Sequence, residues 1–517
     1  MSDLILFNAN VITMDPAFPK AQLVAVKNGK IQNVARNDNF KKLKNPNTKV
    51  IDCRGKTVLP GFIDTHIHFH GFAERLVTLN LSPRNHIQSI SDIRDRIGQL
   101  SKDLPPGTWI RGGGYNEFYL TEKRHPTRWD LDMAASVHPI KLTHRSGRAH
   151  VLNSLALKLV NIKKETADPK EGLIDRDLET GEPTGLLFGM SDYLAKAIPP
   201  IENDQIERGI NLASDELCSL GITSIHDASP RNNSNRWEKF QRWKGGGLLK
   251  SRVSVALGIE GYEEYKKEPF STQINETELK IRGVKIILHE TTGRLTPNQE
   301  ELNEVVLNIH RDGLQVILHA IEEKTIEAAC KVIKFALRKF PKSDHRHRIE
   351  HCSVCTPSLA KRIASLGIMV VTQPNFIYYN GDRYLMTVPK PNLEHLYPIA
   401  TLIKNGVTVA GSSDRPVVPA NPIIGIYSAV SRKTEAGDVV LPGERIVPMD
   451  ALKMYTEDAA KAIFEEKAKG SVSPGKLADL VVLSHDPTEI PVDEIKDIEV
   501  EMTILGGEVV WDKMVNQ

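Results

Sequence analysis

A pair of histidines near the start of the chain could bind a metal ion. His66 and His68 stand two residues apart in the segment DTHIH, at the end of an apolar run. Because side chains alternate along a β-strand, residues two apart point to the same face, so one ion can contact both imidazoles. Imidazole is a common ligand for zinc and other divalent metals. Taken alone, the pair is equally compatible with two structural histidines.

Four further residues of metal-binding or proton-transfer type lie in later apolar runs. They are Lys285 in GVKIILH, His319 in LQVILHA, His351 in HRIEHCS and Asp414 in TVAGSSD. The intervals between them are 34, 32 and 63 residues. These are close to one, one and two strand–helix units of roughly 30 residues each. All four side chains are therefore expected at the same rim of a parallel sheet, where barrel enzymes assemble their sites.

The segments that would position these residues alternate between strand and helix. Eight apolar runs read as buried strands: LPGFIDTHIH, TSIHDA, SVALGI, GVKIILH, LQVILHA, HRIEHCS, IMVVTQP and TVAGSSD. Amphipathic segments such as NQEELNEVVLNIHRDG separate them. This rhythm predicts an α/β protein, and eight is the number of strands that closes a TIM barrel. An open, doubly wound sheet remains the alternative, because the count depends on the strand boundaries.

The two ends of the chain depart from this rhythm. Both contain short strand-like segments broken by Asn, Gly and Pro, a pattern typical of antiparallel sheets. We predict that residues 1–57 and 469–517 form one small discontinuous β domain. Residues 58–468 would then form the barrel domain.

A third part of the chain interrupts the barrel. His68 and Lys285 are 217 residues apart, whereas three strand–helix units would use only about 100. The stretch 80–205 is rich in Gly, Pro and Trp. We therefore predict an insertion over residues 80–205, after the first barrel strand.

The composition of the 517 residues excludes several classes of protein. The chain has 67 basic and 65 acidic side chains, a net charge of +2, which argues against nucleic-acid binding and suggests a small-molecule substrate. No apolar run approaches the roughly 18 residues of a membrane helix, and the N-terminus lacks the features of a signal peptide. Five cysteines are too few for a disulfide framework and fit a reducing compartment. A cytoplasmic location with no membrane partner is expected.

One polar run carries two histidines away from these strand ends. The segment KSDHRHR contains His345 and His347 among five other polar or charged residues. Its composition predicts a solvated loop.

The order of the candidate residues resembles the ligand pattern of the amidohydrolase superfamily: an HxH pair, a strand lysine, two strand histidines and a late aspartate. Segments along nearly the whole chain resemble the amidohydrolase 3 group, the YtcJ-like proteins that include N-substituted formamide deformylases. They are LPGFIDTHIH, HPTRWDLDMAA, GRAHVLNSLAL, PTGLLFG, GITSIHDA, QVILHA, RIEHCS, SLGIMVVTQPNF, GSSDRPV and SPGKLADLVVL. The resemblance implies a TIM-like (β/α)8 barrel with an inserted α+β region and a small β-sandwich formed by both chain ends.

The resemblance also implies a divalent metal site. His66 and His68 would bind one ion and His319 and His351 a second, while Asp414 would touch the metal and accept a proton from bound water. Zinc, which suits imidazole and carboxylate ligands, is the expected metal, with iron and manganese as alternatives. Lys285 resembles the carbamylated lysine that bridges two metals in urease-type relatives. A site with one metal and another role for Lys285 is the alternative, because this chain has His289 and Glu290 where many relatives carry Asp-Gly.

The activity implied is hydrolysis of a non-peptide carbon–nitrogen bond in an amide, a formamide or a cyclic amide. His150 and Asn153, in the inserted region, and Gln373, at a strand end, are predicted to contact the substrate. The alternative is a structural role for His150 and packing against a neighbouring residue for Gln373. The resemblance further suggests a homodimer. Two alternatives remain: a deaminase or another hydrolase or lyase on the same fold, and a regulatory protein that binds a ligand without turnover. Metal analysis of the purified protein would separate the second alternative from an enzyme.

Overall fold

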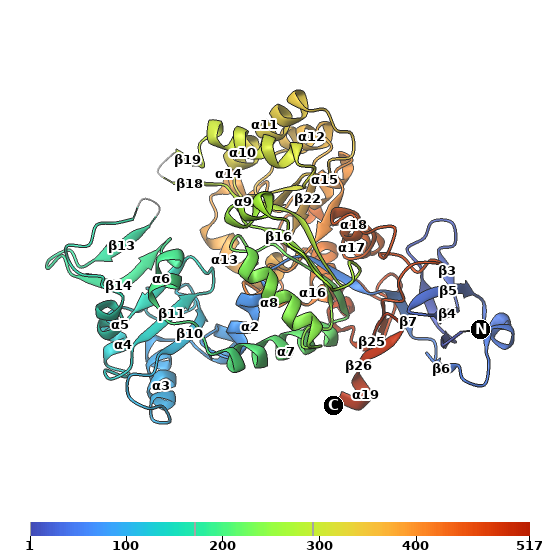
Figure 1. The fold of residues 1–517 in the computed structure, drawn as a ribbon, viewed down its shortest axis with the longest axis horizontal. Coiled ribbons are helices and arrows are strands. Elements are labelled where there is room, and N and C mark those ends of the chain that lie inside the picture. Colours follow the sequence, from blue (N-terminus) through green and yellow to red (C-terminus); the bar gives the residue numbers. More distant parts are fainter. Residues whose placement is uncertain (1, 170–171, 292–293, 517) are drawn as a thin grey trace. The chain divides into compact units, whose positions relative to one another are not determined.

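The computed structural model describes residues 2–169, 172–291 and 294–516, and its central element is an eight-stranded sheet (Figure 1). The strands follow one another in chain order, and every neighbouring pair is parallel. The strands are β8 (Phe62–Ile67), β15 (Ile222–Asp227), β16 (Arg252–Leu257), β17 (Leu279–Ile287), β20 (Val316–Ala320), β21 (Arg348–His351), β22 (Met369–Thr372) and β23 (Val409–Gly411). All eight predicted strand segments are present.

The last strand of this sheet returns to the first. The Thr65 hydroxyl on β8 donates a hydrogen bond to the Gly411 carbonyl on β23 at 2.8 Å. Just beyond β23, the backbone N–H of Asp414 donates to the carbonyl of His66 at 2.9 Å. The sheet is thus a nearly closed barrel, and the predicted TIM-like architecture is confirmed.

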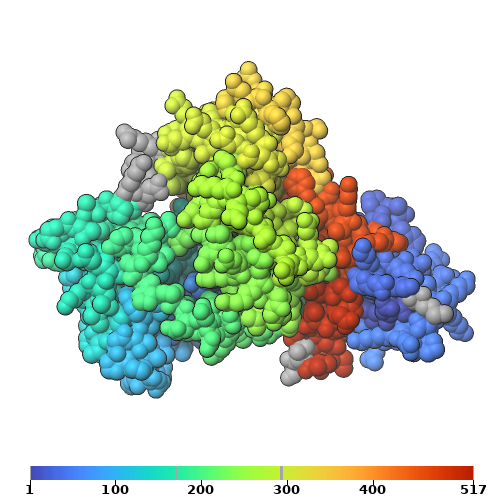
Figure 2. Space-filling view, viewed as in Figure 1, coloured from blue at the N-terminus to red at the C-terminus, as the bar shows by residue number. Residues whose placement is uncertain are grey.

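Helices between the strands cover the outside of the barrel, and the 17-residue helix α11 (Glu323–Lys339) buries one of its faces. In α11, Ile326, Ala329, Ile333 and Ala336 recur at helical spacing and are fully buried. Figure 2 shows the green and yellow helical segments forming the surface over this part of the molecule. The helices are α8 (Ser234–Gly245), α9 (Ile259–Lys267), α10 (Gln299–Arg311), α11 (Glu323–Lys339), α12 (Pro357–Ser365), α13 (Asn375–Thr387), α14 (Lys390–Leu393), α15 (Ile399–Lys404), α16 (Pro422–Ser431), α17 (Pro448–Met454) and α18 (Glu457–Ala462). Within the described ranges, no helix is both long and apolar enough to cross a membrane.

Both ends of the chain contribute to a pair of smaller sheets, drawn in blue and red in Figure 1. One has the strand order β5-β4-β1-β6 and the other β26-β25-β24-β7-β2-β3. Leu6 and Val24 of the first sheet share one apolar core with Val58 and Leu480 of the second. The strands are β1 (Leu4–Phe7), β2 (Asn10–Ile12), β3 (Lys20–Ala21), β4 (Leu23–Lys27), β5 (Lys30–Ala35), β6 (Lys49–Asp52), β7 (Thr57–Pro60), β24 (Leu480–Leu483), β25 (Val500–Leu505) and β26 (Glu508–Asp512), with helices α1 (Phe40–Leu43) and α19 (Lys513–Asn516). The exact division of the chain into 1–57 plus 469–517 and 58–468 stays a prediction.

Residues 70–213 form a compact unit of their own, separate from the rest of the chain. Its sheet has the strand order β13-β14-β12-β11-β10-β9, and its core includes Ile93, Leu131, Leu142 and Val151. The elements are α2 (Phe69–Leu76), β9 (Leu79–Asn80), α3 (Ile90–Ser101), β10 (Ile110–Tyr115), α4 (Arg128–Asp132), β11 (Ile140–His144), β12 (Ala149–Leu152), α5 (Ser154–Leu159), β13 (Leu173–Arg176), β14 (Pro183–Phe188), α6 (Ser191–Ala197) and α7 (Asn203–Ser219), of which α2 and α7 run across its limits. The unit contains the whole range 80–205, for which an insertion is predicted.

The predicted solvated loop at His345 and His347 is wrong. These side chains are only 4% and 0% exposed. His347 contacts Nδ1 of His310 at 2.8 Å and accepts a hydrogen bond from the N–H of Val316 at 3.0 Å, while His345 contacts the carbonyl of Leu366 at 2.9 Å. Polar composition predicts solvent exposure only where no other element supplies hydrogen-bond partners, and here three segments supply them.

Candidate metal centre

The barrel brings the first two predicted ligands to one carboxylate. His66 lies near the end of β8 and His68 follows that strand directly. Their Nε2 atoms lie 3.5 and 3.1 Å from Oδ1 of Asp414. The nearest ligand atoms of all three residues fall within 4.8 Å of one another, so one ion could contact all three. His66, His68 and Asp414 are therefore a candidate metal-binding triad.

Asp414 is held over the end of the barrel by its backbone. Its φ of 56° is in the left-handed region, which is uncommon for a residue other than glycine and often marks functional sites. The preceding Ser413 donates its N–H to Asp64 at 3.1 Å, and that carboxylate also accepts from the N–H of His66 at 3.2 Å. Burial opposes ionisation of Asp414, but its contacts with His68, His66 and His351 lower its pKa well below the ordinary value.

Two more imidazoles lie beside the triad. The ring centroids of His66 and His351 are 5.0 Å apart, and those of His351 and His319 are 4.4 Å apart. His319 lies near the end of β20 and His351 ends β21. Burial is the main cause that lowers the pKa of His66 and His351, which favours the neutral imidazole that binds metals. All four predicted histidines thus converge at the carboxyl ends of barrel strands.

Lys285 lies on β17 with its ammonium nitrogen inside the barrel. The residue is 2% exposed, and Nζ has no hydrogen-bond partner among the described residues. Burial lowers its pKa to about 8, although the charges of Glu350 and Asp414 act in the opposite direction. This buried nitrogen, which has no hydrogen-bond partner among the described residues, lies beside imidazoles and a carboxylate. Such surroundings fit a cation site when the lysine is neutral, because a charged lysine would repel the cation.

Each of three imidazoles has its second nitrogen engaged by a different group. Nδ1 of His66 contacts Glu350, Nδ1 of His351 lies 2.7 Å from Oε1 of Gln373, and Nδ1 of His68 lies 3.2 Å from the hydroxyl of Ser229. Such contacts fix the ring orientation, and an acceptor at Nδ1 selects the tautomer in which Nε2 is free to bind a metal. The donor set and its surroundings therefore fit a divalent cation.

The three residues predicted to contact substrate make internal contacts. Gln373 is fully buried, and besides His351 it donates from Nε2 to the hydroxyl of Ser412 at 2.9 Å. In the unit of residues 70–213, Asn153 caps α5: its Oδ1 accepts from the N–H of Ala156 at 3.0 Å and its Nδ2 donates to a backbone carbonyl at 2.9 Å. His150 contacts the hydroxyl of Ser191 at 2.8 Å. Substrate contact by His150, Asn153 and Gln373 stays a prediction.

The ion pair of Arg348 and Glu350, which contacts His66, was not predicted from the sequence. Arg348 and Glu350 lie on β21, both 0% exposed, with Nε and Oε1 2.7 Å apart. A signal was present, because two charged residues at alternate positions of an otherwise apolar strand share one face and need a partner if that face is buried. The polar run KSDHRHR, which ends at Arg348, obscured this signal.

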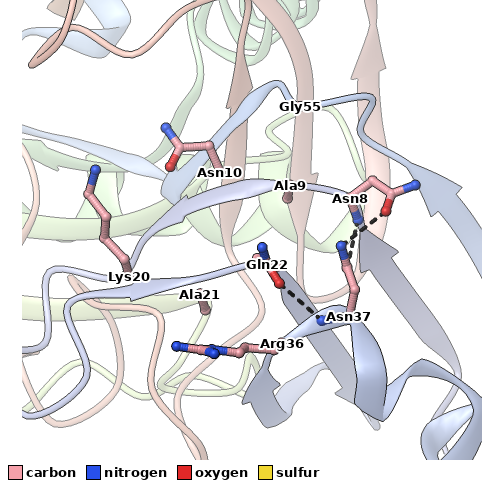
Figure 3. Close-up of a pocket in the computed structure, with 9 residues that line it drawn as sticks. All are labelled: Asn8, Ala9, Asn10, Lys20, Ala21, Gln22, Arg36, Asn37 and Gly55. Carbon is pink, nitrogen blue, oxygen red and sulfur yellow. Dashed lines mark hydrogen bonds between the residues drawn. The ribbon is translucent and has the colours of Figure 1, made fainter.

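A separate cavity of about 610 Å³ lies among the strands of the N-terminal segment (Figure 3). Nδ2 of Asn37 donates to Oδ1 of Asn8 at 3.0 Å, and its backbone N–H donates to Oε1 of Gln22 at 3.4 Å. The cavity is lined by Asn8, Ala9, Asn10, Lys20, Ala21, Gln22, Arg36, Asn37 and Gly55. None of these is a predicted site residue.

Comparisons with known proteins identify the family and the fold of the chain. The amidohydrolase family pattern matches residues 49–511. The chain is 29% identical to the amidohydrolase YtcJ of Bacillus subtilis, over 97% of this chain and 98% of the relative. It is also 29% identical to an N-substituted formamide deformylase of Arthrobacter pascens, over 99% of both chains. A solved structure of a metal-dependent hydrolase from Pyrococcus horikoshii has the same fold, with a TM-score of 0.76, 22% identity and coverage of 95% of this chain and 99% of that one. The chain thus belongs to the amidohydrolase family and is a hydrolase that acts on carbon–nitrogen bonds.

Proposed function

We propose that this protein is a metal-dependent hydrolase that cleaves a non-peptide carbon–nitrogen bond in an amide, a formamide or a cyclic amide. The observation that carries the proposal is the convergence of His66, His68 and Asp414 within 4.8 Å at the end of a parallel barrel. The activity named for the Arthrobacter relative supports an N-substituted formamide as a substrate.

The proposed metal ligands are the residues gathered at the barrel rim. His66, His68 and Asp414 would hold one ion, His319 and His351 a second, and zinc fits this donor set. The unpartnered Nζ of Lys285 supports a bridging carbamate: its lone pair would form a bond to the carbon of carbon dioxide, and the nitrogen would release a proton to water. A metal-to-protein ratio of two supports this bridge, whereas a ratio of one supports a different role for Lys285.

The chemistry divides between the metal and the chain. A divalent cation held by these residues would lower the pKa of a water ligand toward neutrality and would polarise a substrate carbonyl. Asp414 accepts the proton of the attacking water and returns it to the departing nitrogen. The left-handed backbone at Asp414 and its hydrogen bond to the His66 carbonyl keep this carboxylate beside both imidazoles.

Replacing Asp414 by Asn tests this role. The change keeps the shape of the side chain and removes its ability to carry a proton, so turnover is expected to fall about 10²–10⁴-fold while the protein stays folded. The assay is hydrolysis of a panel of N-formyl, N-acyl and cyclic amides by metal-reconstituted protein, with circular dichroism as the folding check. Asp493→Asn, at an exposed carboxylate paired with Lys433, is the matched control and should leave turnover unchanged. Undiminished hydrolysis by Asp414→Asn would contradict the proposed role.

Three finer proposals accompany this function. We infer a cytoplasmic protein, supported by five cysteines that are all free thiols. A homodimer is proposed, and light scattering on the eluted protein tests it. Zinc as the resident metal is tested by elemental analysis of protein purified without added metal.

A further inference from the structure

Glu350 is a buried carboxylate with both oxygens engaged. It lies on β21 and is 0% exposed. Oε2 contacts Nδ1 of His66, and Oε1 lies 2.7 Å from Nε of Arg348. A buried carboxylate needs such partners, because water cannot reach it. Glu350 therefore joins a fixed cation on one side to a metal-site imidazole on the other.

Arg348 is anchored from several directions. Its Nη2 donates to the carbonyl of Thr65, the residue before His66, at 3.1 Å, and to Nδ1 of His226 at 2.7 Å. Because Nδ1 of His226 accepts, its Nε2 carries the hydrogen and donates to the carbonyl of Arg282 at 3.1 Å. Strands β8, β15 and β17 thus hold the guanidinium in place, and the guanidinium in turn holds Glu350.

We propose that Glu350 is a positioning residue for the metal site: it fixes His66 in the tautomer that presents Nε2 to the metal and makes this imidazole a stronger ligand than His68 or His351. The inference rests on the proposed function, since it requires that His66 binds metal. A carboxylate at Nδ1 raises the basicity of the ligating nitrogen more than a neutral acceptor does. His351 and His68 have only an amide and a hydroxyl in the equivalent position.

The rival explanation is that Glu350 only neutralises the buried charge of Arg348. Removing either partner alone leaves an unpaired buried charge, so Glu350→Gln could fail to fold for that reason alone. The double variant Arg348→Met/Glu350→Gln removes both charges together and keeps the approximate volume of both side chains. It separates the two explanations, because charge balance is restored while the carboxylate at His66 is still missing.

The experiment measures Zn²⁺ affinity of apo protein by competition with a chromophoric chelator, together with the unfolding temperature of the apo form. We expect the double variant to unfold near the wild-type temperature and to bind Zn²⁺ about 10- to 100-fold more weakly. Affinity equal to that of the wild type would overturn the inference. Glu465→Gln, which removes another buried carboxylate that is paired with Lys280 at 2.6 Å, is the matched control and should lower the unfolding temperature without changing the affinity.

A measurement on the unmodified protein covers the case in which the variants do not fold. In apo protein labelled with ¹⁵N-histidine, the His66 signal should show a hydrogen on Nδ1 and none on Nε2, with the signal assigned by its loss in His66→Asn. The opposite tautomer would overturn the inference. A wild-type protein that binds no metal would instead contradict the proposed function, whereas metal binding and turnover with the wrong tautomer would contradict only the role of Glu350.

Discussion

Gln373 lies between His351 and Ser412, and both atoms of its amide are engaged. Replacement by Met keeps the volume but leaves Nδ1 of His351 without its acceptor, so the ring can turn away from the site. We expect kcat to fall about 10-fold with KM unchanged, because the lost contact orients a ligand rather than the substrate. Steady-state kinetics on the best substrate of the panel checks this.

A change in KM rather than in kcat for Gln373→Met would support the predicted contact of Gln373 with the substrate. If KM rises and kcat is unchanged, the side chain contributes to substrate binding, and the contact with His351 is incidental. Thr387→Ala, at an exposed hydroxyl that donates to the Arg383 carbonyl of its own helix, is a control on α13 and should change neither constant.

The residues of the site differ in how far the sequence predicts them. His319 and His351 each end an apolar run, and a polar residue at the end of a buried parallel strand is a strong signal. Arg348 ends the polar run and Glu350 follows it, and the partners of the buried Arg348 are His226 and Thr65, which are distant in sequence. Ligand types and spacing are local properties, whereas the groups that orient the ligands are identified only once the barrel is assembled.

At the scale of elements, the packing of α16 against Tyr455 requires a glycine at position 425. A Cβ on Gly425 would overlap the hydroxyl of Tyr455, and that ring also faces Gly411 on β23. Gly425→Ala is therefore expected to destabilise the protein by about 1–3 kcal/mol, although alanine is the better helix former by about 1 kcal/mol. The midpoint of urea unfolding, with activity as a second readout, measures the loss.

Gly98 provides the comparison for this prediction. It lies inside α3, and a Cβ there would stand 3.5 Å from the Ala134 carbonyl oxygen, an ordinary contact. Gly98→Ala should therefore raise the unfolding midpoint slightly, because the helix gains propensity without overlap. Equal effects of the two substitutions would show that the contact with Tyr455 does not limit the packing of α16.

Strand positions are better predicted than the partners of polar residues. Each of the eight barrel strands coincides with an apolar run, because strands buried on both faces leave a continuous signal in the sequence. His345 and His347 precede β21 in a run that reads as polar, yet α10, α12 and neighbouring backbone segments bury them. Such burial depends on contacts between segments that are distant in sequence, and hydropathy along the chain does not predict these contacts.

At the scale of the whole molecule, a buried ionic cluster ties the barrel to the segment that leads into the C-terminal strands. Glu465, after α18, lies 2.6 Å from Nζ of Lys280 on β17 and also contacts Lys469. It accepts a hydrogen bond from Ser254 on β16 at 3.2 Å, and Lys469 donates to Ser224 on β15 at 2.8 Å. Glu465 and Lys469 together thereby link three barrel strands to residues that are distant in sequence.

This cluster predicts how stability depends on pH. Burial alone would raise the pKa of Glu465, but Lys469 and Lys280 lower it from 4.5 to about 2. The stabilisation is therefore fully present above pH 4.5 and is lost as the pH falls from 4.5 towards 2, because the folded state must then take up a proton that the unfolded state already carries. A difference of this size corresponds to about 3 kcal/mol. Glu465→Gln should thus lower the urea midpoint clearly at pH 7, and its deficit relative to the wild type should shrink between pH 4.5 and 3.

The exposed pair of Lys20 and Glu489 is the control for this pH series. Their side chains are 58% and 62% exposed, so the solvent screens the charges and Glu489→Gln should leave the midpoint within error at every pH. If Glu465→Gln has the same deficit at pH 3 as at pH 7, Glu465 acts through its shape and hydrogen bonds and not through its charge. A deficit that shrinks with pH would instead show that ionic contacts join the barrel to the C-terminal segment.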